Sequence, residues 1–219
     1  MTRREDRKRR QLVDLLRDKG ITDERVLAAV GAVPRHHFME DGLHHQAYDD
    51  LALPIGLGQT ISQPFTVARM TELAAIQPGD RVLEVGTGSG YQAAILVEMG
   101  ARVFSVERHE PILDRTKALF RQLEIRVPTR LGDGSRGWPA YAPYDAILVT
   151  AGGAIVPDEL VEQLRPPKEG RPDARMIIPV GSAKTQVLHR ITRVAADGGS
   201  ELVTETFEGV VFVPLVRDA

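Results

Sequence analysis

Residues 82–91 narrow the possible folds of this chain more than any other segment. They read V-L-E-V-G-T-G-S-G-Y, so Gly86, Gly88 and Gly90 directly follow an apolar run, and a helical pattern begins at once after them. Glycine allows positive φ angles and close approach of a ligand, and the free N–H groups at a helix start can face that ligand. The segment therefore predicts a buried strand, a tight turn and a ligand-binding helix N-terminus.

The chain from Asp80 onward alternates short apolar runs with amphipathic ones. The candidate strands cover residues 81–85, 102–106, 127–131, 145–150 and 176–180. Strands that alternate with crossover helices form a parallel sheet that is covered on both faces. We therefore predict an α/β fold with a doubly wound, Rossmann-like sheet that is mostly parallel.

The two ends of the chain have different patterns. Near the N-terminus two helical patterns precede residues 51–65, whose prolines and glycines leave only a loop or a short strand. Near the C-terminus the apolar runs leave no room for crossover helices, so we expect antiparallel pairing. Pro214 cannot donate to a ladder, so we expect the last strand to break its pairing or to lie exposed near it. These C-terminal runs cover residues 187–194, 202–207 and 210–216.

The length of 219 residues suits one domain. We expect three parts within it: an N-terminal helical cap with a substrate loop (1–76), a cofactor-binding α/β core (77–181) and the C-terminal antiparallel strands (182–219).

Composition excludes several classes of protein. The chain has no cysteine, which excludes disulfides, thiolate metal sites and a cysteine nucleophile. Its net charge of −2 gives no overall attraction to polyanions, and the basic N-terminal run is interleaved with Glu5 and Asp6, which favours a solvated helix start. The chain lacks the apolar stretch of a signal peptide or a membrane span. We therefore expect a cytoplasmic monomer without a nucleic-acid or membrane partner.

The histidines at positions 36, 37, 44 and 45 are the only sequence hint of a metal. Adjacent histidines on a helix or strand point in different directions, and no carboxylate spacing supports them. We therefore expect no metal site.

The spacing of the glycines indicates which ligand they hold. A dinucleotide fold prefers G-x-G-x-x-G, whereas this turn reads G-x-G-x-G. Glu107 lies 17 residues after Gly90, at the end of the next candidate strand, where a carboxylate can accept ribose hydroxyls. This pattern resembles the class I S-adenosylmethionine-dependent methyltransferases, although dinucleotide binding stays open at this point. By the same resemblance Asp133 would meet the adenine, while the alternative is that it simply forms a turn.

Further motifs resemble one methyltransferase family in particular, the protein-L-isoaspartate O-methyltransferases. The resemblance spans nearly the whole chain, and Q-T-I-S-Q-P at 59–64 and V-P-L at 213–215 are its most specific parts. The other matching motifs are V-P-R-H-H-F at 33–38, A-L-P-I-G at 52–56, V-A-R-M-T-E-L at 67–73, G-T-G-S-G-Y at 86–91, S-V-E at 105–107, G-D-G at 132–134, A-P-Y-D-A-I at 142–147 and I-P-V-G at 178–181.

This resemblance implies methyl transfer from S-adenosylmethionine to the free α-carboxylate of L-isoaspartyl residues in damaged proteins and peptides, and more weakly to D-aspartyl residues. The product is S-adenosylhomocysteine, and the methyl ester then closes to a succinimide, which starts repair. Ser62 would be the catalytic residue, and it would bind the peptide substrate together with Ile61, Val213 and Pro214. The implied cofactor residues are Thr60, Ile61, Glu84, Gly86, Thr87, Gly88, Gly90, Glu107, Arg108, Asp133 and Gly134.

Ser62 has two readings. The resemblance implies that its hydroxyl orients the substrate carboxylate, whereas its place two residues before Pro64 by itself favours a helix cap. A nucleophilic role is excluded because no activating motif surrounds this serine.

Two other functions stay open. One is a nucleic-acid methyltransferase, although the motifs for amine methylation are absent. The other is a cofactor-binding module without catalysis, or a nicotinamide oxidoreductase. One segment, 165–175, departs from the family pattern, and we expect it to be an exposed, mobile loop.

Overall fold

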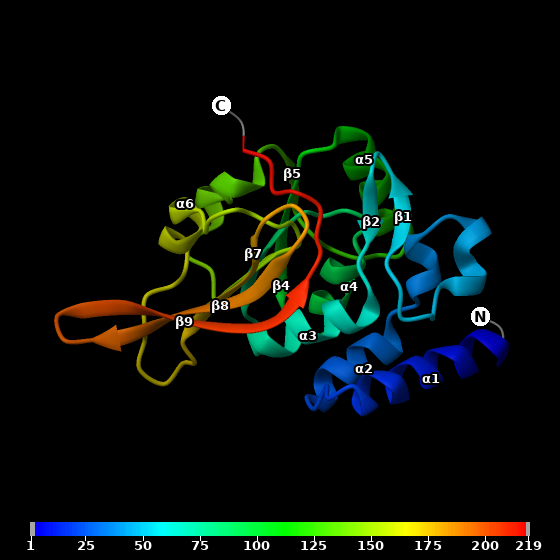
Figure 1. Ribbon diagram of the computed structural model, residues 1–219, viewed down its shortest axis with the longest axis horizontal. Coiled ribbons are helices and arrows are strands. Elements are labelled where there is room, and N and C mark those ends of the chain that lie inside the picture. The colour runs from blue at the N-terminus through cyan, green and yellow to red at the C-terminus, as the bar shows by residue number, and fades with distance from the viewer. Residues whose placement is uncertain (1–2, 218–219) are drawn as a thin grey trace.

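The computed structural model describes residues 3–217 and contains the predicted sheet (Figure 1). Seven strands follow the order β5-β4-β3-β6-β7-β8-β9. The first five in this order pair in parallel, and β8 and β9 pair antiparallel. Their bounds are β3 Arg81–Val85, β4 Arg102–Glu107, β5 Thr129–Leu131, β6 Ala146–Val149, β7 Ala174–Gly181, β8 Gln186–Ala196 and β9 Gly199–Val210. The predicted doubly wound α/β fold is therefore confirmed.

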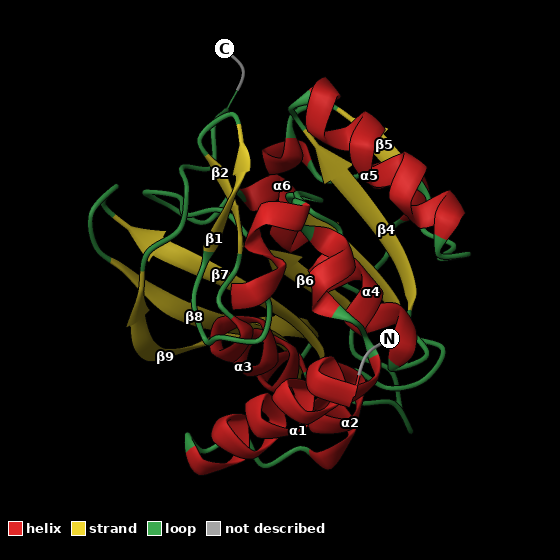
Figure 2. Ribbon diagram, turned by 90° about the vertical axis from the view of Figure 1, so that its right-hand side faces the viewer, coloured by secondary structure: helices red, strands yellow, loops and turns green. Residues whose placement is uncertain are grey.

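Helices cover both faces of the sheet because its strands are apolar on both faces. Val82 packs in one core cluster with α3, α4 and α5, whereas Leu83 and Val85 pack on the other face with α6. Figure 2 shows α3 and α4 packed over the strands. The helix bounds are α1 Arg3–Asp18, α2 Glu24–Ala32, α3 Pro64–Ala74, α4 Tyr91–Glu98, α5 Glu110–Gln122 and α6 Asp158–Glu162. Two short 3-10 helices, Gly134–Arg136 and Pro139–Tyr141, complete the second face.

The N-terminal helices α1 and α2 lie outside α3, as predicted for a cap (Figures 1 and 2). Leu12 and Leu16 of α1 are buried in the same core cluster as Val26 and Leu27 of α2. Asp23 caps α2 by accepting the Arg25 N–H. Two basic side chains of α1 bind within the cap: Lys8 Nζ donates to the carbonyl of His45, and Arg9 Nη1 donates to the carbonyl of Ala32.

Two more 3-10 helices, Arg35–Phe38 and Asp41–Gln46, lead from the cap to a small hairpin. The hairpin pairs β1 (Leu53–Gly56) with β2 (Gln59–Ile61), so the segment predicted as loop or short strand is a pair of short strands. It lies over the glycine-rich turn, where Arg115 of α5 donates to the carbonyl of Ile55. The hairpin therefore brings Q-T-I-S-Q-P to the edge of the sheet where the glycines lie.

The C-terminal strands differ from the prediction. The two runs 187–194 and 202–207 are the middle of longer strands, β8 and β9, which form an arm that projects from the molecule (Figure 1). The predicted strand 210–216 is wrong, because β9 ends at Val210 and the rest makes a single bridge between Pro214 and Gly152. The strand ends before Pro214 because the Phe212 N–H donates to the side-chain oxygen of Gln186 and not to a backbone carbonyl of β8. The expected break in pairing at Pro214 is wrong as well, since Val213 and Leu215 on either side of it both bond to Gly152, and a parallel bridge of this kind does not need the proline N–H.

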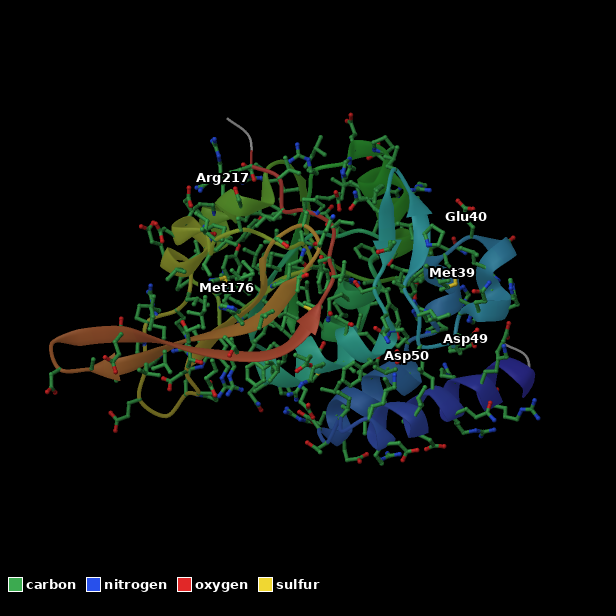
Figure 3. The ribbon with its side chains drawn as sticks, in the orientation of Figure 1. Met39, Glu40, Asp49, Asp50, Met176 and Arg217 are labelled. Carbon is green, nitrogen blue, oxygen red and sulfur yellow. The ribbon has the colours of Figure 1, made fainter. Side chains whose placement is uncertain are left out.

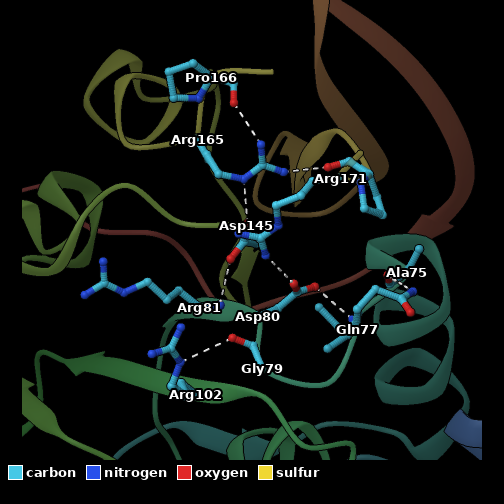
Figure 4. A network of polar contacts seen from close by, with 12 residues as sticks. Ala75, Gln77, Gly79, Asp80, Arg81, Arg102, Asp145, Arg165, Pro166 and Arg171 are labelled. Atoms are coloured by element: carbon cyan, nitrogen blue, oxygen red, sulfur yellow. Dashed lines mark hydrogen bonds and ion pairs between the residues drawn. The ribbon is translucent and has the colours of Figure 1, made fainter. Parts of the chain in front are cut away.

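The amino end of the parallel strands carries a dense set of ion pairs (Figure 4). Asp145 accepts Arg165 Nε at 2.6 Å and lies 3.1 Å from Arg171, which also contacts Asp80 at 3.2 Å. Arg165 is 9% exposed, and its other nitrogens bond to the carbonyls of Pro166 and Pro172. The expectation of an exposed loop at 165–175 is therefore wrong for Arg165, because a buried carboxylate anchors it.

Candidate functional site

The glycine-rich turn has the predicted geometry. Gly86 and Gly90 have φ angles of 97° and 86°, and Gly90 is the residue before α4. A Cβ on Gly86 would collide with Oγ1 of Thr150, the hydroxyl that donates to the carbonyls of Val85 and Gly86. Only glycine fits there, because both the φ angle and the space exclude a side chain.

A cavity of about 270 Å³ opens at the carboxyl ends of β3, β4 and β6. This is where the strand order reverses, the place where ligands bind in doubly wound sheets. The predicted residues that line it are Thr60, Ile61, Ser62, Glu84, Gly86, Thr87, Gly88, Glu107, Arg108, Gly134, Val213 and Pro214. The fold therefore brings together residues that are up to 154 positions apart, from Thr60 to Pro214.

Glu107 at the end of β4 holds the glycine-rich turn in place. Its Oε2 accepts the Gly88 N–H at 2.9 Å, and its Oε1 accepts the N–H groups of Arg108 and His109. A carboxylate has about four acceptor sites, so these three bonds leave about one for a ligand hydroxyl. Glu107 thus has room for the predicted ribose contact and also has a structural role that the sequence did not indicate.

Glu84 at the end of β3 is the most deeply buried acid of the cavity, with no exposed surface. Its Oε2 accepts the hydroxyl of Ser105, which lies 2.7 Å from the hydroxyl of Thr87 in the turn. Burial raises the pKa of Glu84 to about 8, and the negative charge of Glu107 adds to the effect, although the Ser105 hydroxyl opposes it. A carboxyl group in such a place favours a positively charged ligand, because a cation restores its ionised form.

Buried polar atoms without partners show whether the cavity suits a polar ligand. Five such atoms occur among residues 3–217, and three of them belong to residues that line this cavity: Glu84 Oε1, the Tyr91 hydroxyl and Gln92 Oε1. Buried polar groups are costly unless they are hydrogen-bonded. S-adenosylmethionine has an ammonium group, a sulfonium centre and hydroxyls, so it matches both the acid and the open hydrogen-bond positions. The residues present fit this cofactor.

Ser62 lies where this cavity meets a second hollow of about 430 Å³. The helix-cap reading of Ser62 is wrong, since the residue before α3 is Gln63 and no side chain of that position caps the helix. Asp50 supplies the cap instead, because its Oδ1 accepts the backbone N–H of Phe65. Its Oδ2 accepts the side-chain amide of Gln63. Figure 3 shows Asp50 beside the start of α3. The Ser62 hydroxyl is therefore not used by the helix.

Arg35 fixes the backbone at Ser62. This arginine is fully buried, and its guanidinium donates to the carbonyls of Ala47, Leu51 and Ser62. The guanidinium carbon of Arg35 lies 5.7 Å from the centre of the aromatic ring of Tyr91, the first residue of α4. The V-P-R-H-H-F motif thus supplies a support for the serine loop from the N-terminal cap.

The C-terminal segment closes one side of the cavity. The Gly152 N–H donates to the carbonyl of Val213, and the Leu215 N–H donates to Gly152. The Val213 carbonyl is therefore used within the chain, and Pro214 can offer a peptide only its carbonyl oxygen. Arg108 Nη1 donates to the carbonyl of Val216 at 2.9 Å, so this predicted cofactor residue also holds the segment over the cavity.

Two predicted cofactor residues do not line the cavity. Gly90 lies against α5, where a Cβ would approach Phe120 and Thr116 within 3 Å. Asp133 accepts the N–H and the hydroxyl of Ser135, which is the turn that the alternative reading predicted. Its contact with adenine stays a prediction.

The histidines of the cap form a ring cluster. His36 is buried, its Nδ1 lies 2.7 Å from the Tyr48 hydroxyl, and its ring packs on His37 and His44. Within the described part of the chain, no three His, Cys, Asp or Glu side chains are placed to hold a metal ion.

Comparison with known proteins decides between the readings of the glycine turn. The family model of protein-L-isoaspartate (D-aspartate) O-methyltransferase matches residues 7–219. The chain belongs to this family. A protein-L-isoaspartate O-methyltransferase of Salinibacter ruber is 53% identical over 212 residues, covering 96% of this chain and 92% of that protein. One of Vibrio cholerae is 50% identical over 207 residues and covers 94% of each chain.

Solved structures of the protein-L-isoaspartate O-methyltransferase family have the same fold. One is 28% identical with a TM-score of 0.80, covering 95% of this chain and 66% of that longer chain. Another, from Plasmodium falciparum, is 24% identical with a TM-score of 0.79 and was solved in complex with S-adenosyl-L-homocysteine. It covers 96% of this chain and 99% of that one. The family resemblance and the dependence on S-adenosylmethionine are therefore confirmed, and the nicotinamide alternative is wrong.

Sequence reasoning missed several residues of the site. Thr150 and Gln92 line the cavity, and Asp50, Arg35 and Ser105 support it from outside. Arg35 lies in the V-P-R-H-H-F motif at 33–38, so the sequence carried a signal for it. Asp50 gave none, because it caps a helix that begins 14 residues later.

Proposed function

We propose that this chain transfers a methyl group from S-adenosylmethionine to the free α-carboxylate of L-isoaspartyl residues in damaged proteins, and more weakly to D-aspartyl residues. The observation that carries the proposal is the place of Ser62, at the junction of the cofactor cavity and the second hollow. Family membership supports the reaction. The second hollow, between α3 and the end of β9, then receives the peptide, and the cavity receives the cofactor.

The cofactor's charged end would lie near Glu84 and the glycine turn, and its ribose near Glu107. When bound, S-adenosylmethionine supplies an electrophilic methyl group. The buried oxygen of Glu84 without a partner supports this orientation.

The protein needs no general base for this reaction. An α-carboxylic acid has a pKa near 4 and is already ionised at neutral pH, so no proton has to be removed. Placement of the reacting atoms is the main task, and good placement can contribute about 7–11 kcal/mol. The Ser62 hydroxyl donates a hydrogen bond to the substrate carboxylate, and Arg35 keeps the serine backbone in position.

The reaction is tested with paired peptides that differ only in Asp or isoAsp. We expect methyl label from S-adenosylmethionine on the isoAsp peptide and almost none on the Asp peptide. Equal labelling of the two, or labelling of RNA that persists when the peptide competes, would refute the proposal and favour another acceptor. The ester should then decay to a succinimide without further enzyme.

Removal of the Ser62 hydroxyl tests its role. A hydrogen bond to a charged group contributes about 1.5–3 kcal/mol, so we expect Ser62→Ala to lower kcat about 10- to 150-fold. The dissociation constant of S-adenosylhomocysteine, measured by calorimetry, should change less than about threefold. Ser200→Ala, at an exposed position of the β8–β9 arm, is the matched control and should keep full activity. A large loss of cofactor affinity with unchanged kcat would contradict the assigned role.

We also propose that the chain acts as a single-domain monomer in the cytoplasm. The shared apolar core of the N-terminal cap and the α/β unit supports a single domain. None of the helices within residues 3–217 has the length and apolar character needed to cross a membrane. Sedimentation of the purified protein tests whether it is a monomer, and fractionation of cells tests whether it lies in the cytoplasm.

A further inference from the structure

The second hollow, which we call the peptide groove, runs from Ser62 toward the end of β9. Its walls are formed by residues of 60–69 on one side and 208–213 on the other. Apolar and uncharged polar residues make up most of the surface. Among the described residues that line it, only Arg69 and Glu208 carry a charge. The charge preference of the groove therefore depends on this pair.

The positive charge of Arg69 in α3 is shared between two carboxylates of this chain. Its Nε donates to Glu208 Oε1 at 3.0 Å, and its Nη1 donates to Glu72 Oε2 at 2.8 Å. Its guanidinium carbon lies 5.4 Å from the centre of the Phe207 ring. Glu72 is held in place as well, because its Oε1 accepts the N–H groups of Thr22 and Asp23. The arginine is thus shared by two carboxylates and covered by an aromatic ring.

Glu208 keeps one carboxylate oxygen for a ligand. Its side chain is 34% exposed, and its Oε2 has no hydrogen-bond partner within residues 3–217. One guanidinium between two carboxylates leaves a surplus negative charge at this end of the groove. A cationic side chain that enters the groove can bind Glu208 Oε2 without breaking the existing ion pairs, whereas an acidic side chain meets repulsion.

The distance from the reaction site to Glu208 is short enough for a neighbouring residue of the same peptide. Val213 lines both the cofactor cavity and the peptide groove, and Glu208 precedes it by five residues. Five extended residues span at most about 18 Å. A long side chain within about three residues of the isoaspartyl residue can therefore reach Glu208.

We propose that Glu208, held in place by Arg69, makes the enzyme prefer isoaspartyl sites that have a lysine or arginine close by in the sequence over sites flanked by acidic residues. This inference rests on the proposed function, because it assigns the peptide to the groove beside Ser62. Glu208 is a specificity-determining residue and not a catalytic one, since it lies away from the reacting atoms.

The test uses isoaspartyl peptides that carry either Lys or Glu at one position, scanned over three positions on each side of the isoaspartyl residue. Two quantities are measured for each pair: kcat/KM for methylation, and the Kd of the fluorescently labelled peptide in the presence of S-adenosylhomocysteine. For wild type we expect the Lys peptide to be preferred about two- to fivefold at one or more positions, the range of an exposed ion pair. Glu208→Gln should bring that ratio close to one, and Glu208→Lys should invert it.

Glu205→Gln is the matched control. Glu205 lies on the same strand, pairs with Arg190 at 2.7 Å and is not part of the groove, so its loss removes the same charge at a different place. The control should keep the wild-type ratio. The proposal is overturned if wild type shows no preference for Lys, if Glu208→Gln keeps the preference, or if Glu205→Gln removes it equally. If wild type methylates none of the peptides, the proposed function fails, and the Kd ratios still decide the charge preference.

Discussion

The two ends of the parallel sheet treat buried charge in opposite ways. At the amino end Asp145 and Arg165 are both nearly buried and paired at 2.6 Å, and Arg171 and Asp80 extend the network (Figure 4). At the carboxyl end Glu84 is fully buried, yet its only described side-chain partner is the hydroxyl of Ser105, and one of its oxygens has no partner. The same sheet thus has one end that is electrostatically complete and one that is not.

The difference separates residues that stabilise from residues that bind. A buried ion pair is destabilising to break, because one charge is left without its partner. An unpaired buried acid lowers the stability of the protein alone, and such perturbed groups gather at functional sites. The incomplete end is also where the cofactor cavity lies.

The largest effect is expected from a variant that breaks the ion pairs at the amino end of the parallel strands. Asp145→Ala leaves the guanidinium of Arg165 buried without its carboxylate, so we expect the free energy of unfolding to fall by about 3–5 kcal/mol. Urea denaturation measures it. Asp114→Ala, which removes an exposed carboxylate 3.8 Å from Lys117, should cost less than about 1 kcal/mol. Equal losses in the two variants would show that the network adds nothing beyond a surface ion pair.

The next largest effect is the pH dependence of the unfolding free energy that Glu84 causes at the carboxyl end of the strands. The folded-state pKa of Glu84 is raised by burial from 4.5 to about 8, so the folded protein binds more protons than the unfolded chain between these pH values. The contribution of this carboxyl to stability is therefore fully present below pH 4.5 and is lost as the pH rises through 8. Without cofactor, wild type should lose about 3 kcal/mol of unfolding free energy relative to Glu84→Gln between pH 5 and pH 8.

Urea denaturation at several pH values checks this comparison. The difference between the curves of wild type and Glu84→Gln removes the titration of the other groups, because these groups titrate in both proteins. One of them is Glu107, whose charge acts on Glu84. Parallel curves for the two proteins would mean that Glu84 has an ordinary pKa, and the contrast between the two ends would then rest on hydrogen bonds alone.

The smallest effect sharpens the role of Glu107. Loss of its charged acceptor should cost about 1.5–3 kcal/mol of cofactor binding, so Glu107→Ala should raise the Kd of S-adenosylhomocysteine about 10- to 150-fold. Part of this loss should come from the turn, because Glu107 also holds the Gly88 N–H. Glu98→Ala, at the exposed end of α4, is the control for calorimetry. An unchanged Kd would remove Glu107 from the cofactor site.

Local patterns predicted the elements well where one residue type decides the geometry. The strand before Gly86, the turn and the helix after Gly90 follow from glycine and apolar spacing. Local patterns failed where a distant residue decides. Ser62 looked like a cap because Asp50 could not be connected to α3, and the loop at 165–175 looked free because Asp145 lies 20 residues before Arg165.

The amino-acid sequence by itself determined the alternation of strands and helices, the glycine turn and the family, because these depend on neighbours along the chain and on whole motifs. Only the tertiary structure decided which buried charges are paired, which hydroxyl is left for a substrate and where the two hollows meet. The physical reason is that pairing and burial depend on distances across space, and Glu84 and Asp145 look alike in the sequence although one lacks a charged partner and the other has two.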